Sequence, residues 1–288
     1  MGVGGEINRD MFGSRRCSGI GGSSGRYALV ILVSLMCAAA ATESRAFGLA
    51  VLRSPEEAAL AMDAPVFSLV FEAAPGDSIA SSWSVQAGEW RLFDDAGLSA
   101  TVCGGHLRRG DWGCGVRAAM VSSPIGEEAV LTGAILTPVS GRVRLAGDVR
   151  FNVATFDGFE RAYLLCLSLH ALLRLSPHVA LCPGVENIRV RGEESAGADA
   201  SLLVAAFSNQ PLCGVVETRV SRRGALTFGV SSRLRVGHGV VFAVGYDDGT
   251  GTLNGSLSLR FRSMGLEAGA SVHPVLGVSE GLFMSWRR

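Results

Sequence analysis

The stretch R-V-R-L-A-G-D-V-R-F-N-V, from Arg142 to Val153, decides the fold that we expect for this chain. Apolar residues or glycine occupy every odd position, and polar residues occupy every even position except Ala146. A period of two is typical of a β-strand with one apolar face and one polar face. A soluble sheet has such strands, and so does a membrane barrel, in which the apolar face contacts lipid.

The rest of the chain favours the barrel. Strand-length segments separated by turn residues follow one another from Val66 to Trp286. In Leu226–Val236 and Thr252–Arg262 the alternation continues for about ten residues, the length that a tilted strand needs to cross a membrane. Strands of soluble proteins are nearer to about five or six residues. We therefore predict an all-β fold, an antiparallel transmembrane β-barrel, with a soluble exported β-protein as the alternative.

Composition agrees with an exported membrane protein. The chain has 288 residues, of which 38 are glycine and 48% are hydrophobic, and its formal net charge is zero. The mean hydropathy of +0.32 is high for a soluble protein. Because there is no excess of positive charge, nothing indicates a nucleic-acid partner.

The N-terminus has the layout of a secretory signal peptide. An apolar run, Ala28 to Ala41, follows Arg15, Arg16 and Arg26 and precedes the small residues Ser44 and Ala46. We predict cleavage after Ala46, so that residues 1–46 are the signal peptide. Residues 47–64 form an N-terminal segment with a short helix that begins at Ser54-Pro55-Glu56-Glu57, and residues 65–288 form the barrel.

The C-terminal part of the sequence resembles a known family. Gly245-Tyr246 and His273-Pro274-Val275-Leu276-Gly277, within Val244–Ser279, follow the order of strand-end and hairpin motifs in PorV/PorQ-like proteins. These are FadL-like outer-membrane barrels. The resemblance implies about 14 strands, the outer membrane of a Gram-negative-type bacterium, and a role in lipophilic transport or protein secretion.

The sequence carries no motif of an enzyme. There is no nucleophile elbow, phosphate loop, Cys-x-x-Cys or His-Glu-x-x-His motif, and the nearby Ser168, His170 and Asp157 have no supporting pattern. We therefore expect neither catalysis nor a metal or other cofactor.

Arginines gather on the polar faces of the expected strands, where acidic residues are fewer. If these faces line a lumen, the lumen is electropositive and favours anions, as rings of arginine do in anion pores. In the other interpretation, which we favour, the charges form a structural network with acids, headgroups or loops. The candidate lumen-lining residues are Arg142, Arg144, Asp148, Arg150, Arg219, Arg233, Arg235, Arg260, Arg262, Glu217 and Glu267.

The cysteines give two further predictions. Patterning places Cys103 inward and Cys114 outward, so these two are not expected to bond. Cys166 and Cys182 face each other within disulfide reach if their hairpin is centred on Arg174. A turn centred on Pro177 separates them, and this alternative stays open.

For function, we expect an outer-membrane barrel whose one certain partner is the lipid bilayer. Its role is passive transport, or service to a secretion or envelope-assembly system with protein partners. The alternatives are a structural or adhesion barrel without transport, and a soluble periplasmic β-protein that binds a ligand.

Overall fold

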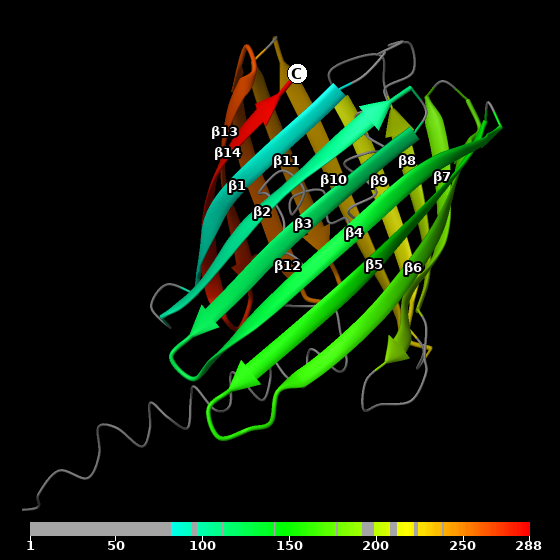
Figure 1. Cartoon of the computed structure of the whole chain (residues 1–288). Helices are drawn as coiled ribbons and strands as arrows, with labels where there is room; N and C mark the ends of the chain where they lie inside the picture. The colour runs from blue at the N-terminus through cyan, green and yellow to red at the C-terminus, as the bar shows by residue number, and fades with distance from the viewer. Residues whose placement is uncertain are drawn as a thin grey trace, which may run out of the picture.

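Fourteen antiparallel strands close into one barrel (Figure 1). The computed structural model describes residues 82–93, 97–110, 112–140, 142–176, 178–191, 199–207, 212–221, 224–237 and 239–288. Each strand pairs with its neighbours in sequence, and β1 pairs with β14 to close the ring. The strands are β1 Ser82–Leu92, β2 Leu98–Arg109, β3 Trp112–Ser123, β4 Gly126–Ser140, β5 Val143–Phe156, β6 Ala162–Arg174, β7 Val179–Arg191, β8 Asp199–Phe207, β9 Leu212–Val220, β10 Leu226–Val236, β11 Val240–Asp247, β12 Thr252–Phe261, β13 Met264–His273 and β14 Gly277–Arg287.

This architecture confirms the all-β barrel and its predicted number of strands. Strand β5 shows why the sequence specifies it. Leu145, Val149 and Phe151 are exposed on the outer wall, whereas Ala146 and Asp148 between them are buried on the inner side. Because side chains alternate along a strand, one pattern of period two produces both walls at once.

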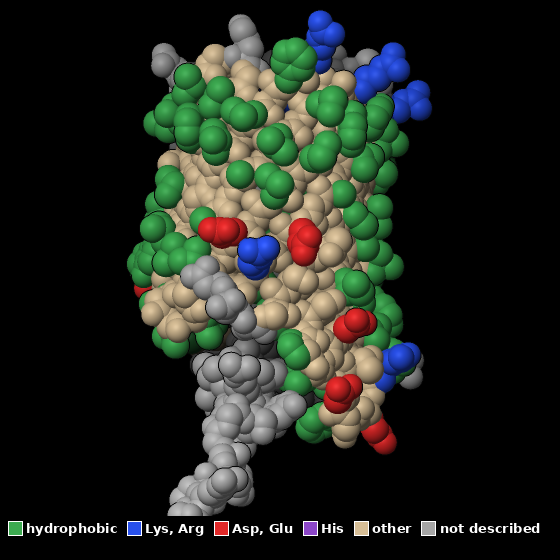
Figure 2. All heavy atoms as spheres, turned by 90° about the vertical axis from the view of Figure 1, so that its left-hand side faces the viewer, with side chains coloured by type: hydrophobic (Ala, Val, Ile, Leu, Met, Phe, Trp, Pro, Cys, Tyr) green, Lys and Arg blue, Asp and Glu red, His purple; other side chains and the backbone are tan. Residues whose placement is uncertain are grey.

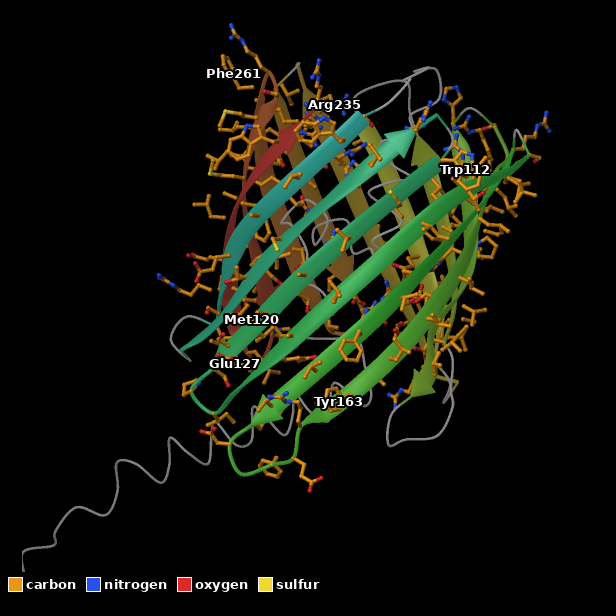
Figure 3. All side chains as sticks on the ribbon, viewed as in Figure 1. Trp112, Met120, Glu127, Tyr163, Arg235 and Phe261 are labelled. Atoms are coloured by element: carbon orange, nitrogen blue, oxygen red, sulfur yellow. The ribbon has the colours of Figure 1, made fainter. Side chains whose placement is uncertain are left out.

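Large apolar side chains are exposed on the outer wall of all fourteen strands. Aromatic residues lie near both ends of this belt, as in transmembrane barrels, where such girdles mark the two interfaces. Figure 3 shows Trp112 and Phe261 near one end and Tyr163 near the other. Tyr163 stacks on Phe151 of the neighbouring strand, with ring centroids 6.2 Å apart.

The two rims of the barrel differ in the length of their connections. We call the rim at which β14 ends the C-terminal rim, and the opposite one the far rim. At the C-terminal rim the connections span two residues (110–111) to four residues (175–178). At the far rim they span two residues (124–125) to seven residues (192–198).

The hairpin of β6 and β7 is centred on Pro177, because Arg174 pairs with Ala180 and Leu173 with Leu181. This register separates Cys166 from Cys182, and both are free thiols. The possible disulfide is therefore absent. This is the register of the alternative centred on Pro177, which the turn preference of proline favours in the sequence.

Cys103 and Cys114 are also free, as expected, but both lie exposed on the outer wall. The prediction that Cys103 points inward was wrong. A two-residue turn begins at Gly110, whose φ is +58°, and pairs Arg109 with Trp112. In this register Val102 faces the interior and Cys103 faces outward. The apolar Val102 is stable there because the interior at this point is also apolar.

The signal peptide and the segment of residues 47–64 with its short helix lie outside the described residues and remain predictions. Within the described residues, no helix is long and apolar enough to cross a membrane.

Candidate functional site: the barrel interior

The interior of the barrel has two chemically different walls. We call the first the apolar wall; it lies on β14 and β1 to β4 and consists of Trp90, Leu92, Ala100, Val102, Ala119, Val130 and Phe283. We call the second the polar wall; it lies on β5 to β9 and contains the buried residues Asp148, Ser168, His170, Glu186, Ser201, Glu217 and Arg219. The two clusters differ in polarity, although buried Leu203 and Val215 also lie on strands of the polar wall, and buried Arg108 and Thr132 lie on strands of the apolar wall.

The apolar wall is built around two aromatic side chains that cover glycines of the neighbouring strand. Trp90 of β1 pairs with Gly281 of β14, and Phe283 of β14 pairs with Gly88 of β1. The two rings meet edge to face, with centroids 6.2 Å apart and planes at 66°. Such an arrangement is favourable for aromatic quadrupoles, and an aromatic ring over a cross-strand glycine fills the space that a side chain would take.

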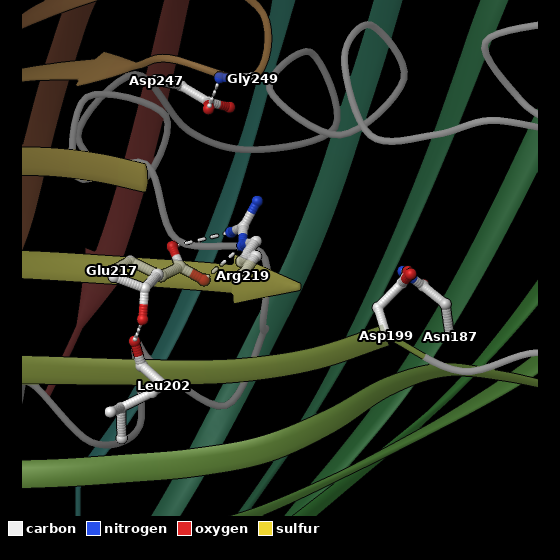
Figure 4. A network of polar contacts seen from close by, with 8 residues as sticks. Asn187, Asp199, Leu202, Glu217, Arg219, Asp247 and Gly249 are labelled. Atoms are coloured by element: carbon white, nitrogen blue, oxygen red, sulfur yellow. Dashed lines mark hydrogen bonds and ion pairs between the residues drawn. The ribbon is translucent and has the colours of Figure 1, made fainter. Parts of the chain in front are cut away.

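The polar wall is held by hydrogen bonds between side chains of different strands (Figure 4). Arg219 binds Glu217 with two hydrogen bonds, Nε to Oε1 at 2.5 Å and Nη2 to Oε2 at 2.8 Å. Asn187 Nδ2 donates to Asp199 Oδ2 at 3.1 Å, and Arg150 Nη1 donates to Asn187 Oδ1 at 3.5 Å. These contacts link β5, β7 and β8 and pair charges of opposite sign within β9.

A β-bulge in β7 concentrates polar groups at this wall. Leu167 pairs with Ile188 and Leu169 with Val185, so Glu186 and Asn187 together oppose a single residue of β6. Asn187 has a φ of +54°, in the left-handed region that asparagine tolerates better than most residues. Bulges redirect side chains in this way next to functional sites.

Asp148 and His170 are the least satisfied groups of the polar wall. Each is 4% exposed. Ser168, Arg150 and His170 lie near the Asp148 carboxylate, but neither of its oxygens has a hydrogen bond of good geometry, and neither does His170 Nε2. The His170 ring lies over Gly184, where an added Cβ would overlap it. Because buried polar atoms are normally hydrogen-bonded, these two side chains are unusual within the polar wall.

A metal is not indicated by the described part of the chain. No group of three or more histidine, cysteine, aspartate or glutamate side chains there has an arrangement that could hold one.

The structure places most of the candidate lumen-lining residues at inward positions. Glu217, Arg219 and Asp148 are buried, and the others in this set are partly buried; these are Arg144, Arg150, Arg233, Arg260 and Glu267. They do not form one ring, because they are spread over β5, β9, β10, β12 and β13. Their neighbours include other polar groups; for example, the Ser258 hydroxyl donates to Glu267 Oε1 at 3.2 Å.

Three of the candidates lie elsewhere. Arg142 is exposed in the turn before β5, where the strand has not yet begun. Arg262 is exposed in the two-residue turn after β12, and its guanidinium lies 5.6 Å from the centroid of the Phe261 ring. Arg235 is exposed near the end of β10, at the C-terminal rim (Figure 3). Alternation alone does not show where a strand ends. The pattern therefore predicted inward side chains at these three positions, which lie at the rim.

The apolar wall has no clear counterpart in the sequence pattern. In β1 the apolar residues change face, from the outward Trp83 and Val85 to the inward Trp90 and Leu92. This change of parity is the signal that could have revealed an apolar interior. The β7 bulge had a weaker signal, the polar pair Glu186-Asn187 in a strand whose first residues, Val179 to Cys182, are apolar.

No protein-family model matches the sequence, and no curated protein matches it. Solved structures match the fold. The Acinetobacter baumannii outer membrane protein Omp33 aligns with 74% of this chain and 100% of its own, at 10% identity and a TM-score of 0.52. The chain has the fold of an outer-membrane β-barrel. The CymD monoaromatic hydrocarbon channel aligns with 84% of this chain and 98% of its own, at 9% identity and a TM-score of 0.53.

These similarities concern the fold of the whole barrel. They agree with the outer-membrane barrel of the predicted family resemblance, but they do not single out FadL-like or PorV/PorQ-like proteins.

Proposed function

We propose that this protein resides in the outer membrane of a Gram-negative-type bacterium and carries out passive transport of small solutes. The observation that supports this most is the closed ring of fourteen strands with apolar side chains exposed on every one. Short turns face the periplasm in such barrels and longer loops face outward. By this rule the C-terminal rim is periplasmic.

The solute that fits the interior best is a small molecule with an apolar part and a polar part. The apolar wall offers Trp90 and Phe283, and the polar wall offers Asp148 and His170. The similarity to CymD, described as a monoaromatic hydrocarbon channel, supports the apolar part of such a solute.

Conductance and uptake test this proposal. Purified protein in planar bilayers is expected to give discrete conductance steps, and proteoliposomes are expected to take up small aromatic acids or alcohols faster than protein-free vesicles. Asp148→Asn, inside the barrel, should shift the permeability of cations relative to anions. Glu127→Gln, the same chemical change at an exposed outer position, is the matched control and should leave it unchanged. A folded barrel with neither conductance nor uptake would refute transport and favour a structural or adhesion role.

Two finer proposals come from the family resemblance. We propose membership of the FadL-like, PorV/PorQ-like group, supported by the C-terminal motifs and the fourteen strands. A role as an accessory of secretion or envelope assembly is the second candidate. It predicts that a defined envelope protein copurifies with the barrel, in stoichiometric amounts, from membranes that retain it.

We also propose that the protein is not an enzyme. In support, Asp157 is exposed in the turn between β5 and β6, whereas Ser168 and His170 are buried inside the barrel. Incubation with ester and peptide substrates should release no product above the rate of a Ser168→Ala variant.

A further inference from the structure

The outer wall at the junction of β1 and β14 differs from the rest of the outer surface. At outward positions the described strands carry mainly apolar and small residues. Three charged residues, Glu89, Arg91 and Glu280, lie together at this junction. The other outward charges of the described strands, Arg109 and Glu127, lie at strand ends. Figure 2 views this side of the barrel and shows one basic side chain between two acidic ones, with apolar side chains above them and to both sides.

The three charges form a compact group, which we call the junction triad. Arg91 is directly opposite Glu280 across the β1–β14 pair, and Glu89 lies two residues before Arg91 on the same face. All three side chains are exposed. Within the described part of the chain, no hydrogen bond or ion pair engages any of them. Charged groups on a lipid-facing wall are destabilising even when they lie beside opposite charges, which favours a protein surface that removes them from lipid.

Mostly small residues surround the junction triad on the outer wall. Ala87 on β1, Cys103 on β2, and Ala268 and Ala270 on β13 occupy outward positions near it. The large exception is Leu282 of β14, which lies directly opposite Glu89 and is 58% exposed. Small side chains allow another wall to approach closely, as they do between helices in membranes.

We propose that a second copy of this chain docks at the β1–β14 junction, with a two-fold axis parallel to the membrane normal. Such a rotation keeps each residue at its depth in the membrane and exchanges left and right. It therefore places β1 of one copy against β14 of the other. Arg91 of each copy then faces the partner's Glu280, so the dimer contains two such pairs. The junction triad is complementary to itself in this arrangement. The inference rests on the proposed membrane location, but it does not require transport.

Cross-linking in phospholipid vesicles tests this arrangement. Ala87→Cys is introduced into a variant in which Cys103→Ser and Cys114→Ser remove the exposed native thiols. We expect a short bis-maleimide to convert this variant to a covalent dimer. Leu202→Cys on β8, also outward but far from the junction, is the matched control and should remain monomeric. Equal yields at the two positions would indicate random collisions and overturn the proposal.

Charge exchange identifies the pairing. In the Ala87→Cys background, Arg91→Glu or Glu280→Arg alone should lower the dimer yield by roughly tenfold, since two ion pairs are lost together. The double variant should restore it. Heat-modifiable mobility verifies folding, and Arg91→Gln and Glu280→Gln replace any swapped variant that does not fold. Two results would overturn the proposal and assign the triad to lipid headgroups. One is a double variant with a dimer yield as low as that of the single variants. The other is a full dimer yield for Arg91→Gln and Glu280→Gln. A barrel that dimerises without conducting would refute transport and leave this inference intact.

Discussion

Substituting Gly281 with alanine tests whether the aromatic rings at the β1–β14 junction depend on glycine. An added Cβ would lie 2.8 to 2.9 Å from three atoms of the Trp90 indole, whereas ordinary contact begins at 3.4 Å. The ring must therefore move by about 0.6 Å, the difference between 3.4 and 2.8 Å. Trp90 is 1% exposed and packs against Phe283, which is also 1% exposed, so there is little free space.

Overpacking of a filled core costs about 1–3 kcal/mol, and we expect a loss of this size in the free energy of unfolding for Gly281→Ala. Trp90→Leu removes the part of the ring that collides. In that background the same glycine substitution should cost less than about 0.5 kcal/mol, because alanine is otherwise acceptable in a strand. The coupling between the two sites is then about 1–3 kcal/mol, as for residues in direct contact.

Urea unfolding in phospholipid vesicles, followed by tryptophan fluorescence and by heat-modifiable gel mobility, measures these values. Gly133→Ala is the matched control, because nothing lies within 4 Å of its added Cβ on the outer wall. It should change the free energy of unfolding by less than about 0.5 kcal/mol. If Gly281→Ala costs as much with Trp90→Leu as without it, the rings do not depend on the glycine and the reasoning fails.

Three more substitutions probe the outer and inner walls, each measured by the same unfolding assay. Val149→Arg on the outer wall of β5 should cost about 2–4 kcal/mol if that site is near mid-membrane, and Thr155→Arg near the far rim about 0–1 kcal/mol; equal costs would contradict the lipid-facing assignment. Asn187→Ala removes two side-chain hydrogen bonds at a positive φ and should cost about 1–3 kcal/mol, whereas no change would mean that the bulge does not depend on Asn187. Glu217→Gln leaves the buried Arg219 charge uncompensated within this pair and should cost about 3–5 kcal/mol; a value under 1 kcal/mol would indicate that other groups hold Arg219.

The sequence was sufficient for the fold because one physical rule produces it. Alternation in Arg142–Val153 and Thr252–Arg262 requires a wall with two faces, and strands of this length suit a membrane better than a soluble core. The outward positions of Leu145, Val149 and Phe151 follow directly from that alternation.

The interior was harder to predict, because neighbours across strands determine it. The rule that the apolar face points outward fails in β2, where Val102 packs inside with Trp90 and Phe283 from two other strands. Only the register of three strands together reveals that cluster. Likewise, Cys166 and Cys182 were placed opposite each other by a hairpin register that the Pro177 turn overrides. A shift of a few residues at a turn changes every pair along both strands.

The order of the strands has a consequence for how the barrel folds. Thirteen of its fourteen pairings join strands that are consecutive in the chain, and the fourteenth joins residues as distant as Ser84 and Arg287. Bringing such distant segments together carries the largest loss of chain entropy, so we expect this pairing to form last. Contacts that form after the transition state affect mainly the unfolding rate. Substitutions at Trp90, Phe283 or Gly281 should therefore speed unfolding while the rate of folding stays nearly constant, which makes the junction the element that sets the lifetime of the closed ring.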